Sequence, residues 1–387
     1  MKTKTFVVLF IILVALAGAV SLLIYSRATR SPSGEMGTVL LDQLPANEIA
    51  SIIIETPNAA VSLKKGSDSW IVEERFGYPA DFSKISDLVR TLKEVKVGRK
   101  FDASEKVLKR LSMKSPGDAG VLKEETGTRI RMADSGGKTL LEIVLGKTRT
   151  RDPQKGPPDG QYVMLSNAPE IYLIDKILSS FETGPSAWLE KKPIEIDAAK
   201  IRKITCLGPD ATTVRYAFER PEKGKDFELI EPSTDRNVKK SSINRLSNAL
   251  SSLKIEDVET SVASRKSFGK DASARLDYVL FDGRVYHVTV GKACSATIPC
   301  QIRLAVDYEP PGPATTGADQ AAKTEEKAHA GTQSGEAIAA DASKENGRLS
   351  PWIFTIPEWQ YKAFFPQVDE LLEKKAEKKA AQGTPVN

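Results

Sequence analysis

Few residues in this sequence of 387 are of a type that carries chemistry, and the cysteines come first among them. Cys294 and Cys300 flank SATIP at the mouth of a predicted hairpin, where one strand ends and the next begins. This spacing fits a disulfide, and closing a ring of roughly seven residues would stabilise the fold by about 2 kcal/mol. Two separate thiols or a metal pair are the alternatives, although no third or fourth metal ligand lies nearby in the sequence.

The remaining cysteine and the two histidines favour structural roles. Cys206 falls at a strand position, where a small buried hydrophobic residue is expected. His287 also lies in a predicted strand, and His329 lies in a low-complexity segment. With so few histidines, the sequence argues against histidine-dependent triads and zinc-hydrolase sites.

Gly146-Lys147-Thr148 has the form of the end of a phosphate-binding loop. That motif also requires a glycine five positions before Gly146, where Leu141 stands. We therefore interpret Gly146 as the end of a strand and Lys147 as an exposed side chain.

Two other functions are weighed as alternatives. A glycosidase-type enzyme needs two acids that converge in a cleft with shifted pKa values. The candidate acids occupy positions typical of caps, turns and strand faces; they are Glu73, Asp81, Asp134 and Glu142. A glycan- or peptidoglycan-binding module would instead use exposed aromatic residues, here Trp70, Tyr78, Trp188, Trp352 and Trp359. Clustering of the first three on one exposed face would favour that module, and burial would remove it. We predict no catalytic, cofactor-binding or metal-ligating residue.

Residues 6–25 form an uncharged apolar run. As a helix rising about 1.5 Å per residue, the run would span a hydrocarbon core of about 30 Å. A cleaved signal peptide is the alternative, but its small-residue site at Ala15-Leu16-Ala17 lies inside the run. Lys2 and Lys4 on one side of the run are balanced by Arg27 and Arg30 on the other, and the α-amine gives a small bias toward a cytoplasmic N-terminus. The rest of the chain would then lie outside the cytoplasm. An oxidising compartment there permits the disulfide.

The charge pattern argues against a nucleic-acid partner. The net charge is +5, and the 28% of residues that are charged have both signs interspersed. A nucleic-acid binder is expected to gather its positive charge on one face.

Aligning Gly146 with Gly291 indicates that the sequence contains an internal duplication. Two alternating strands joined by a proline turn begin near Glu48 and again near Lys200. A predicted helix follows in each copy, capped by Asp81 or Ser83 in the first. Its apolar stripe recurs in the second copy, with Ile85, Leu88, Leu92 and Val95 matched by Ile243, Leu246, Leu250 and Leu253. Hairpins with tight turns at Ser135-Gly136-Gly137 and at Asp282-Gly283 come next.

The predicted organisation has five parts. They are a transmembrane signal anchor over residues 1–30, a linker over 31–43, a first α+β repeat over 44–185, a second over 196–366, and a charged C-terminal tail over 367–387. Within the second repeat, an insert over 308–349 is rich in Ala, Gly, Thr, Glu and Lys, and this composition predicts disorder.

Several segments carry a family resemblance: the apolar N-terminus, WIVEERFGYPADFSKISDLVRTL from Trp70, LEIVLGKT from Leu141, QYVML from Gln161 and IYLIDKIL from Ile171. Over most of residues 44–365 the chain resembles DUF4340, a family of domains of unknown function. The resemblance implies a bacterial, single-pass, tandemly repeated protein found beside ABC-type transport systems of the gliding-motility auxiliary kind. It implies no activity. The second copy departs most, with Phe227 in place of Trp70, so any shared site is expected in the first.

We therefore predict an α+β fold with two homologous domains, each a mostly antiparallel sheet with helices on one face, after an N-terminal transmembrane helix. The predicted role is that of a structural or interaction protein, an accessory to a membrane complex such as an ABC-type transporter. Its predicted location is the bacterial inner membrane, with the N-terminal helix in the bilayer and the bulk of the chain outside the cytoplasm.

Overall fold

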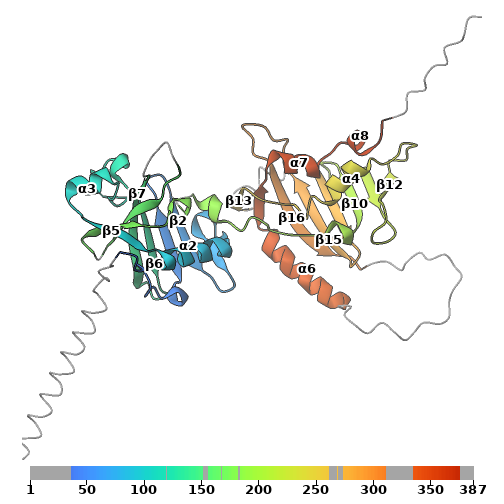
Figure 1. The fold of residues 1–387 in the computed structure, drawn as a ribbon. Helices are drawn as coiled ribbons and strands as arrows, with labels where there is room; N and C mark the ends of the chain where they lie inside the picture. The colour runs from blue at the N-terminus through green and yellow to red at the C-terminus, as the bar shows by residue number, and fades with distance from the viewer. Residues whose placement is uncertain are drawn as a thin grey trace, which may run out of the picture. The chain divides into compact units, whose positions relative to one another are not determined.

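The computed structural model describes residues 36–374, apart from 119, 151–155, 167, 182–183, 261–267, 269–272 and 311–333. The chain divides into two compact units, with the boundary between Leu189 and Glu190. Each unit is built on one antiparallel sheet (Figure 1). The predicted transmembrane segment lies outside the described residues. Within those residues, no helix combines the length and the apolar composition that crossing a membrane requires.

In the first unit the described residues form a sheet of nine strands in the order β4-β3-β2-β1-β6-β7-β8-β9-β5. The strands are β1 (Ser51–Glu55), β2 (Ala60–Lys65), β3 (Trp70–Val72), β4 (Tyr78–Pro79), β5 (Val97–Asp102), β6 (Thr128–Ala133), β7 (Thr139–Arg149), β8 (Gly160–Leu165) and β9 (Glu170–Ile174). The helices are α2 (Phe82–Glu94) and α3 (Glu105–Arg110), with short 3-10 turns η1 (Ala46–Glu48), η2 (Glu73–Arg75), η3 (Lys123–Glu125), η4 (Ser179–Phe181) and η5 (Pro185–Trp188).

The described residues of the second unit form an eight-stranded sheet in the order β12-β11-β10-β14-β15-β16-β17-β13. The strands are β10 (Ile201–Leu207), β11 (Val214–Glu219), β12 (Glu228–Glu231), β13 (Asp257–Thr260), β14 (Ala274–Leu280), β15 (Arg284–Val290), β16 (Gln301–Tyr308) and β17 (Trp352–Thr355). The helices are η6 (Ala198–Lys200), α4 (Lys240–Ser247), α6 (Gly335–Leu349), α7 (Glu358–Phe364) and α8 (Val368–Leu371).

The two sheets have the same strand order once β4 is left out, because β12 takes the place of β3 and β13 that of β5. Their cores match as well. In the first sheet, cross-strand pairing lines up four buried side chains, Ile54, Ile130, Ile143 and Leu165. The corresponding row in the second sheet is Cys206, Leu276, Val288 and Leu304. Both units therefore follow one plan.

Helix α2 forms as its sequence predicts. The Asp81 side chain caps the helix by accepting hydrogen bonds from the backbone N–H groups of Ser83 (3.0 Å) and Lys84 (3.2 Å). Ile85, Leu88 and Leu92 recur at helical spacing and are buried. The helix lies across one face of the first sheet (Figure 1).

The first unit has a second, smaller core, which places a helix on the opposite face of its sheet. Leu111, Met113, Val144 and Ile171 form this cluster, and Val107 and Leu108 of α3 pack against it. Val144 follows Ile143 of the main core along β7, and successive strand residues point to opposite faces. The prediction of helices on one face only is therefore wrong for this unit, because the connection between β5 and β6 folds back over the sheet.

In each unit, a short segment at the C-terminal end pairs with the residues just before a helix, α2 in the first unit and α4 in the second. Ala80 forms a β-bridge with Leu189, and the Asp81 N–H donates to the Trp188 carbonyl (2.8 Å). In the second unit Val238 pairs with Leu372 in the same way, and the Lys239 N–H donates to the Leu371 carbonyl (2.8 Å). The duplicated frame thus continues past residues 185 and 366, where we expected the repeats to end.

The predicted disordered insert is in part a helix. Gly335–Leu349 forms α6, which begins at the Ser334 cap and buries Ala342 and Leu349. The prediction of disorder is wrong for this segment, because alanine and charged residues are strong helix formers once a surface is present to pack on. That surface is β16, whose own strand pairing reaches Tyr308. Residues 311–333 lie outside the described part.

Candidate binding groove

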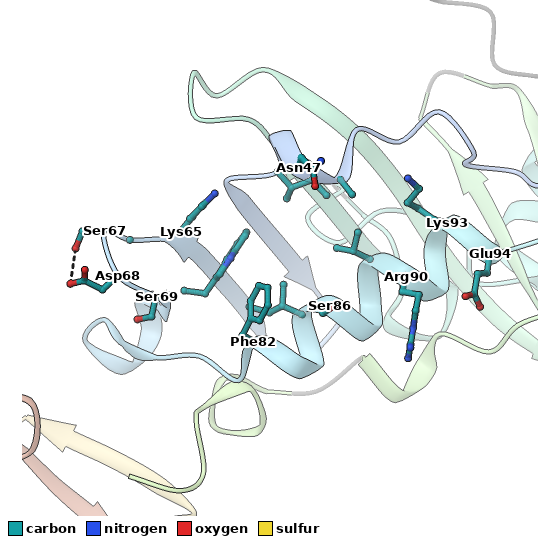
Figure 2. A pocket seen from close by; sticks show the side chains of 16 residues that line it. Asn47, Lys65, Ser67, Asp68, Ser69, Phe82, Ser86, Arg90, Lys93 and Glu94 are labelled. Carbon is teal, nitrogen blue, oxygen red and sulfur yellow. Dashed lines mark hydrogen bonds between the residues drawn. The ribbon is translucent and has the colours of Figure 1, made fainter. Parts of the chain in front are cut away.

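The first unit contains an open groove of about 1080 Å³ along α2. Its walls are η1, the turn that joins β2 to β3, and one side of α2. In Figure 2, Phe82 stands on the first turn of α2 and Lys93 on the last, while Asn47 and Lys65 lie across the groove from the helix. The groove therefore runs along most of the helix.

Apolar side chains line the interior of the groove. Ile49, Trp70 and Ile85 are buried at its base. Val89 is half-buried, and Phe82 on the rim is 62% exposed. A large exposed aromatic residue beside an apolar channel is typical of a surface that a partner covers.

The charges on the rim leave an excess of positive charge. Arg90 forms an ion pair with Asp87 (2.7 Å), and Glu94 forms one with Lys176 (3.7 Å). Lys65 and Lys93 are exposed, and neither has an ion pair with another described residue. Asp68 adds one negative charge at the turn, where it accepts a hydrogen bond from the Ser67 hydroxyl (3.3 Å).

The second unit has an equivalent groove that is smaller and differs in its lining. Its walls are η6, the turn that joins β11 to β12, and α4, and its volume is about 600 Å³. Backbone hydrogen bonds establish the equivalence, because the Lys65 N–H donates to the Ala50 carbonyl (2.9 Å) and the Arg220 N–H donates to the Arg202 carbonyl (3.0 Å). Arg220 therefore occupies the position of Lys65.

Arg220 occupies part of this second groove and lines what remains open. It is buried, its Nε donates to the Ile201 carbonyl (2.7 Å), and its Nη2 donates to the Ala198 carbonyl. Its guanidinium lies 4.4 Å from the centre of the Phe227 ring, a cation–π distance. Burial lowers the pKa of this guanidinium from its usual value. Lys65 does not enter the groove of the first unit in this way, so the space beside Trp70 stays open.

The helix wall also differs between the units. Aligning Ile85 with Ile243 places Phe82 opposite Lys240 and Val89 opposite Ser247. Two of the apolar residues that line the first groove, Phe82 and Val89, are thus matched by polar residues in the second. The presence of Arg220 and this change make the second groove less suited to an apolar ligand.

The cysteines lie as follows. Cys294 and Cys300 form a disulfide with Cα atoms 4.7 Å apart. Cys206 is a fully buried free thiol, as its strand position predicts. Burial raises the pKa of this thiol, which disfavours the reactive thiolate.

His287 lies in a polar network that sequence reasoning missed. Its Nδ1 is 2.6 Å from Asp277 Oδ1 and its Nε2 is 3.0 Å from Asp307 Oδ2. Arg275 donates from Nε to the same Asp277 oxygen (2.7 Å). Because both ring nitrogens are engaged, His287 joins three neighbouring strands and is not directed at a substrate. The only sequence signal for this network was the alternation of polar residues along β14, β15 and β16.

The candidate acids do not converge. Asp81 caps α2, and Asp134 accepts hydrogen bonds in the turn between β6 and β7. Glu73 forms an ion pair with Lys64 (2.5 Å), and Glu142 lies in β7. Across the described residues, no group of His, Cys, Asp and Glu side chains is arranged to hold a metal ion.

The aromatic residues considered for a glycan-binding module do not form an exposed cluster. Trp70, Tyr78 and Trp188 are buried, with exposed fractions of 8%, 4% and 0%. Trp188 packs against Phe181 and carries Lys84 over its ring at 4.6 Å. Trp352 is half-buried and Trp359 is exposed in the second unit. These positions remove the proposed aromatic platform for a glycan.

Fold and site together define a duplicated antiparallel α+β protein in which one of two equivalent grooves is open and apolar. The chain belongs to the family described as domain of unknown function (DUF4340), whose family model matches residues 70–273, more than half of the chain. The match begins at β3 and ends just before β14, so it crosses from the first unit into the second. Neither a curated protein nor a solved structure matches the chain.

Proposed function

We propose that this protein is a membrane-anchored, extracytoplasmic interaction subunit, an accessory to a membrane complex such as an ABC-type transporter in the bacterial inner membrane. The observation that supports it most is the contrast between the two grooves. One unit has an open apolar groove, while in the other the buried Arg220 occupies part of the equivalent space and the groove is smaller.

The proposed location rests on two features. Residues 6–25 have the length and apolar character of a membrane span. The Cys294–Cys300 disulfide suits an oxidising compartment, which the space outside the bacterial inner membrane provides.

We infer a binding role and not catalysis. Catalytic acids commonly have raised pKa values. Among the described residues, every carboxyl group with a shifted pKa value is shifted downward; these groups are Glu105, Asp210, Asp277 and Asp282. Such lowered values are those of carboxylates held by hydrogen bonds and nearby cations.

The experiment that tests this function is crosslinking of the full-length protein in its native membrane. Purification in mild detergent and mass spectrometry would then identify the crosslinked partners. We expect ABC-type membrane or ATPase subunits linked through residues 44–372. Recovery of the protein without a membrane partner would overturn the proposal.

A further inference from the structure

We propose that the groove along α2 is the docking site for an amphipathic helix of a partner protein, with leucine-like side chains on one face and acidic residues beside them. This inference rests on the proposed function and names the class of partner that the first unit recognises. It follows from the shape, the lining and the charge of the groove, and from its comparison with the second unit.

The shape suits a helix. Helix α2 has 13 residues and is therefore about 20 Å long. The groove follows it from Phe82 on the first turn to Lys93 and Glu94 on the last (Figure 2). A partner helix of about three to four turns could lie along this length with its apolar face inward, the arrangement by which many grooves bind amphipathic helices.

The lining supplies the apolar contacts. Phe82 and Val89 are seven residues apart, so they stand two turns from one another on the same side of α2. Trp70 and Ile49 form the base between the helix and the opposite wall. Apolar side chains of the partner at similar spacing would cover Phe82, which is otherwise 62% exposed.

The rim supplies the charge preference. Lys65 and Lys93 lie on opposite walls, and neither is neutralised by an ion pair with a described residue. Acidic side chains beside the apolar face of the partner would lie near these ammonium groups, whereas basic ones would be repelled. Such complementarity acts on recognition and association rate more than on total affinity.

The second unit provides an internal comparison. There, Lys240 and Ser247 replace Phe82 and Val89, and Arg220 lies over Phe227 within the groove. The same frame therefore exists in this chain with a more polar helix wall and a smaller groove, about 600 Å³ against about 1080 Å³. We assign docking to the first unit alone.

The test measures binding of a synthetic probe to the full-length protein in lipid nanodiscs. The probe is a fluorescent helix of about 14 residues, long enough for the groove, with leucine at every third or fourth position and glutamate on the flanking positions. A second probe carries lysine in place of each glutamate. Fluorescence anisotropy reports the affinity.

The decisive variant transplants residues of the second unit into the first, as Phe82→Lys with Val89→Ser. Both positions are at least partly exposed, so the fold is expected to persist. Leu122→Lys is the matched control, because Leu122 is 63% exposed in the same unit and does not line the groove. We expect the double variant to bind the acidic probe at least about tenfold more weakly, and Leu122→Lys to bind it unchanged. The lysine probe should bind more weakly than the acidic one.

Equal binding of the acidic probe to the wild type and the double variant would overturn the proposal. The proposal would also be overturned if neither helical probe bound while dodecanoate, a fatty acid tested in the same way, bound to the wild type and not to the double variant. The groove would then hold a lipid-like molecule. If probe binding fails but partner subunits still purify with the wild-type chain, the docking site is wrong while the proposed function stands. If no partner purifies with the chain, the proposed function itself fails.

Discussion

At Gly146, the absence of a side chain allows the connection between β5 and β6 to pack against β7. Gly146 does not end its strand, contrary to the sequence interpretation, because β7 continues to Arg149. A Cβ atom at Gly146 would overlap the Leu111 carbonyl and the Met113 sulfur, which lie over this part of β7. Gly291 takes the same place in the second unit, where Phe268 and Gln301 crowd it. The two glycines that align the repeats in the sequence are thus both explained by close packing, which is tighter at Gly146 than at Gly291.

Gly146→Ala should lower the free energy of unfolding by about 1–3 kcal/mol, the usual cost of overpacking a tight site. Urea denaturation followed by tryptophan fluorescence measures this change. Gly184→Ala is the control, since among the described residues no atom beyond its chain neighbours lies within 4 Å of the added Cβ. Equal stability of the two variants would show that the connection does not pack on Gly146.

Asp277 makes the second unit sensitive to acid. Burial alone would raise the pKa of this carboxyl group, but hydrogen bonds and charge from His287 and Arg275 outweigh burial and lower it below the usual 3.8. Because the folded pKa is lower than the unfolded one, the charged form favours the folded state. This contribution is fully present above about pH 4 and is lost as the pH falls toward the lowered folded value.

Asp277→Asn should therefore lose less stability than the wild type between about pH 4 and pH 2. Urea-unfolding midpoints measured across this range give the comparison. The asparagine keeps a hydrogen-bond acceptor, so the two proteins differ mainly in the charge at this site. If the urea-unfolding midpoints of the two proteins fell equally between about pH 4 and pH 2, the role given to Asp277 would be wrong.

At the scale of single elements, α6 covers an open sheet edge. Of β16, only Gln301–Arg303 pairs with β17, and no other described strand pairs with the rest of that edge. Asn346 of α6 accepts a hydrogen bond from the Val306 N–H (3.0 Å) at this edge. Covering an edge in this way prevents it from pairing with other chains.

Asn346→Ala should expose this backbone group and speed amide exchange in the segment around Val306. Hydrogen–deuterium exchange with mass spectrometry detects the change in peptides that contain β16. Glu336→Ala, at an exposed position in the first turn of the same helix, should leave the exchange unchanged. Unaltered exchange in both variants would mean that α6 does not protect the edge.

Elements with a strong local pattern could be predicted from the sequence, and elements that depend on distant contacts could not. Alternating strands, the α2 stripe with its Asp81 cap and the glycine turns are all local, and the structure contains them. By contrast, α6 is stabilised by an edge that its own composition does not reveal. The groove could not be predicted because nothing in the local pattern marks Phe82 and Val89 as uncovered. Their exposure to the groove depends on the path of η1 and of the turn after β2.

For the molecule as a whole, the disulfide allows the proposed location of the chain outside the cytoplasm to be tested. A membrane-impermeant maleimide added to intact cells should label Cys294 and Cys300 only after reduction, since they are bonded to one another. Cys206 should resist labelling until the protein unfolds, because its thiol is buried. Labelling of Cys294 and Cys300 without reductant would contradict an oxidising environment for this unit.

The central claim, that this protein binds a membrane partner through the open groove of its first unit, is tested most directly by site-specific photo-crosslinking. A photoreactive residue replaces Phe82 or, as a control, Leu122 in the full-length protein in its native membrane, and mass spectrometry identifies what is attached. We expect one defined subunit of an ABC-type membrane complex to be crosslinked at position 82 and not at position 122. Crosslinking of the same proteins at both positions, or of none at position 82, would contradict it.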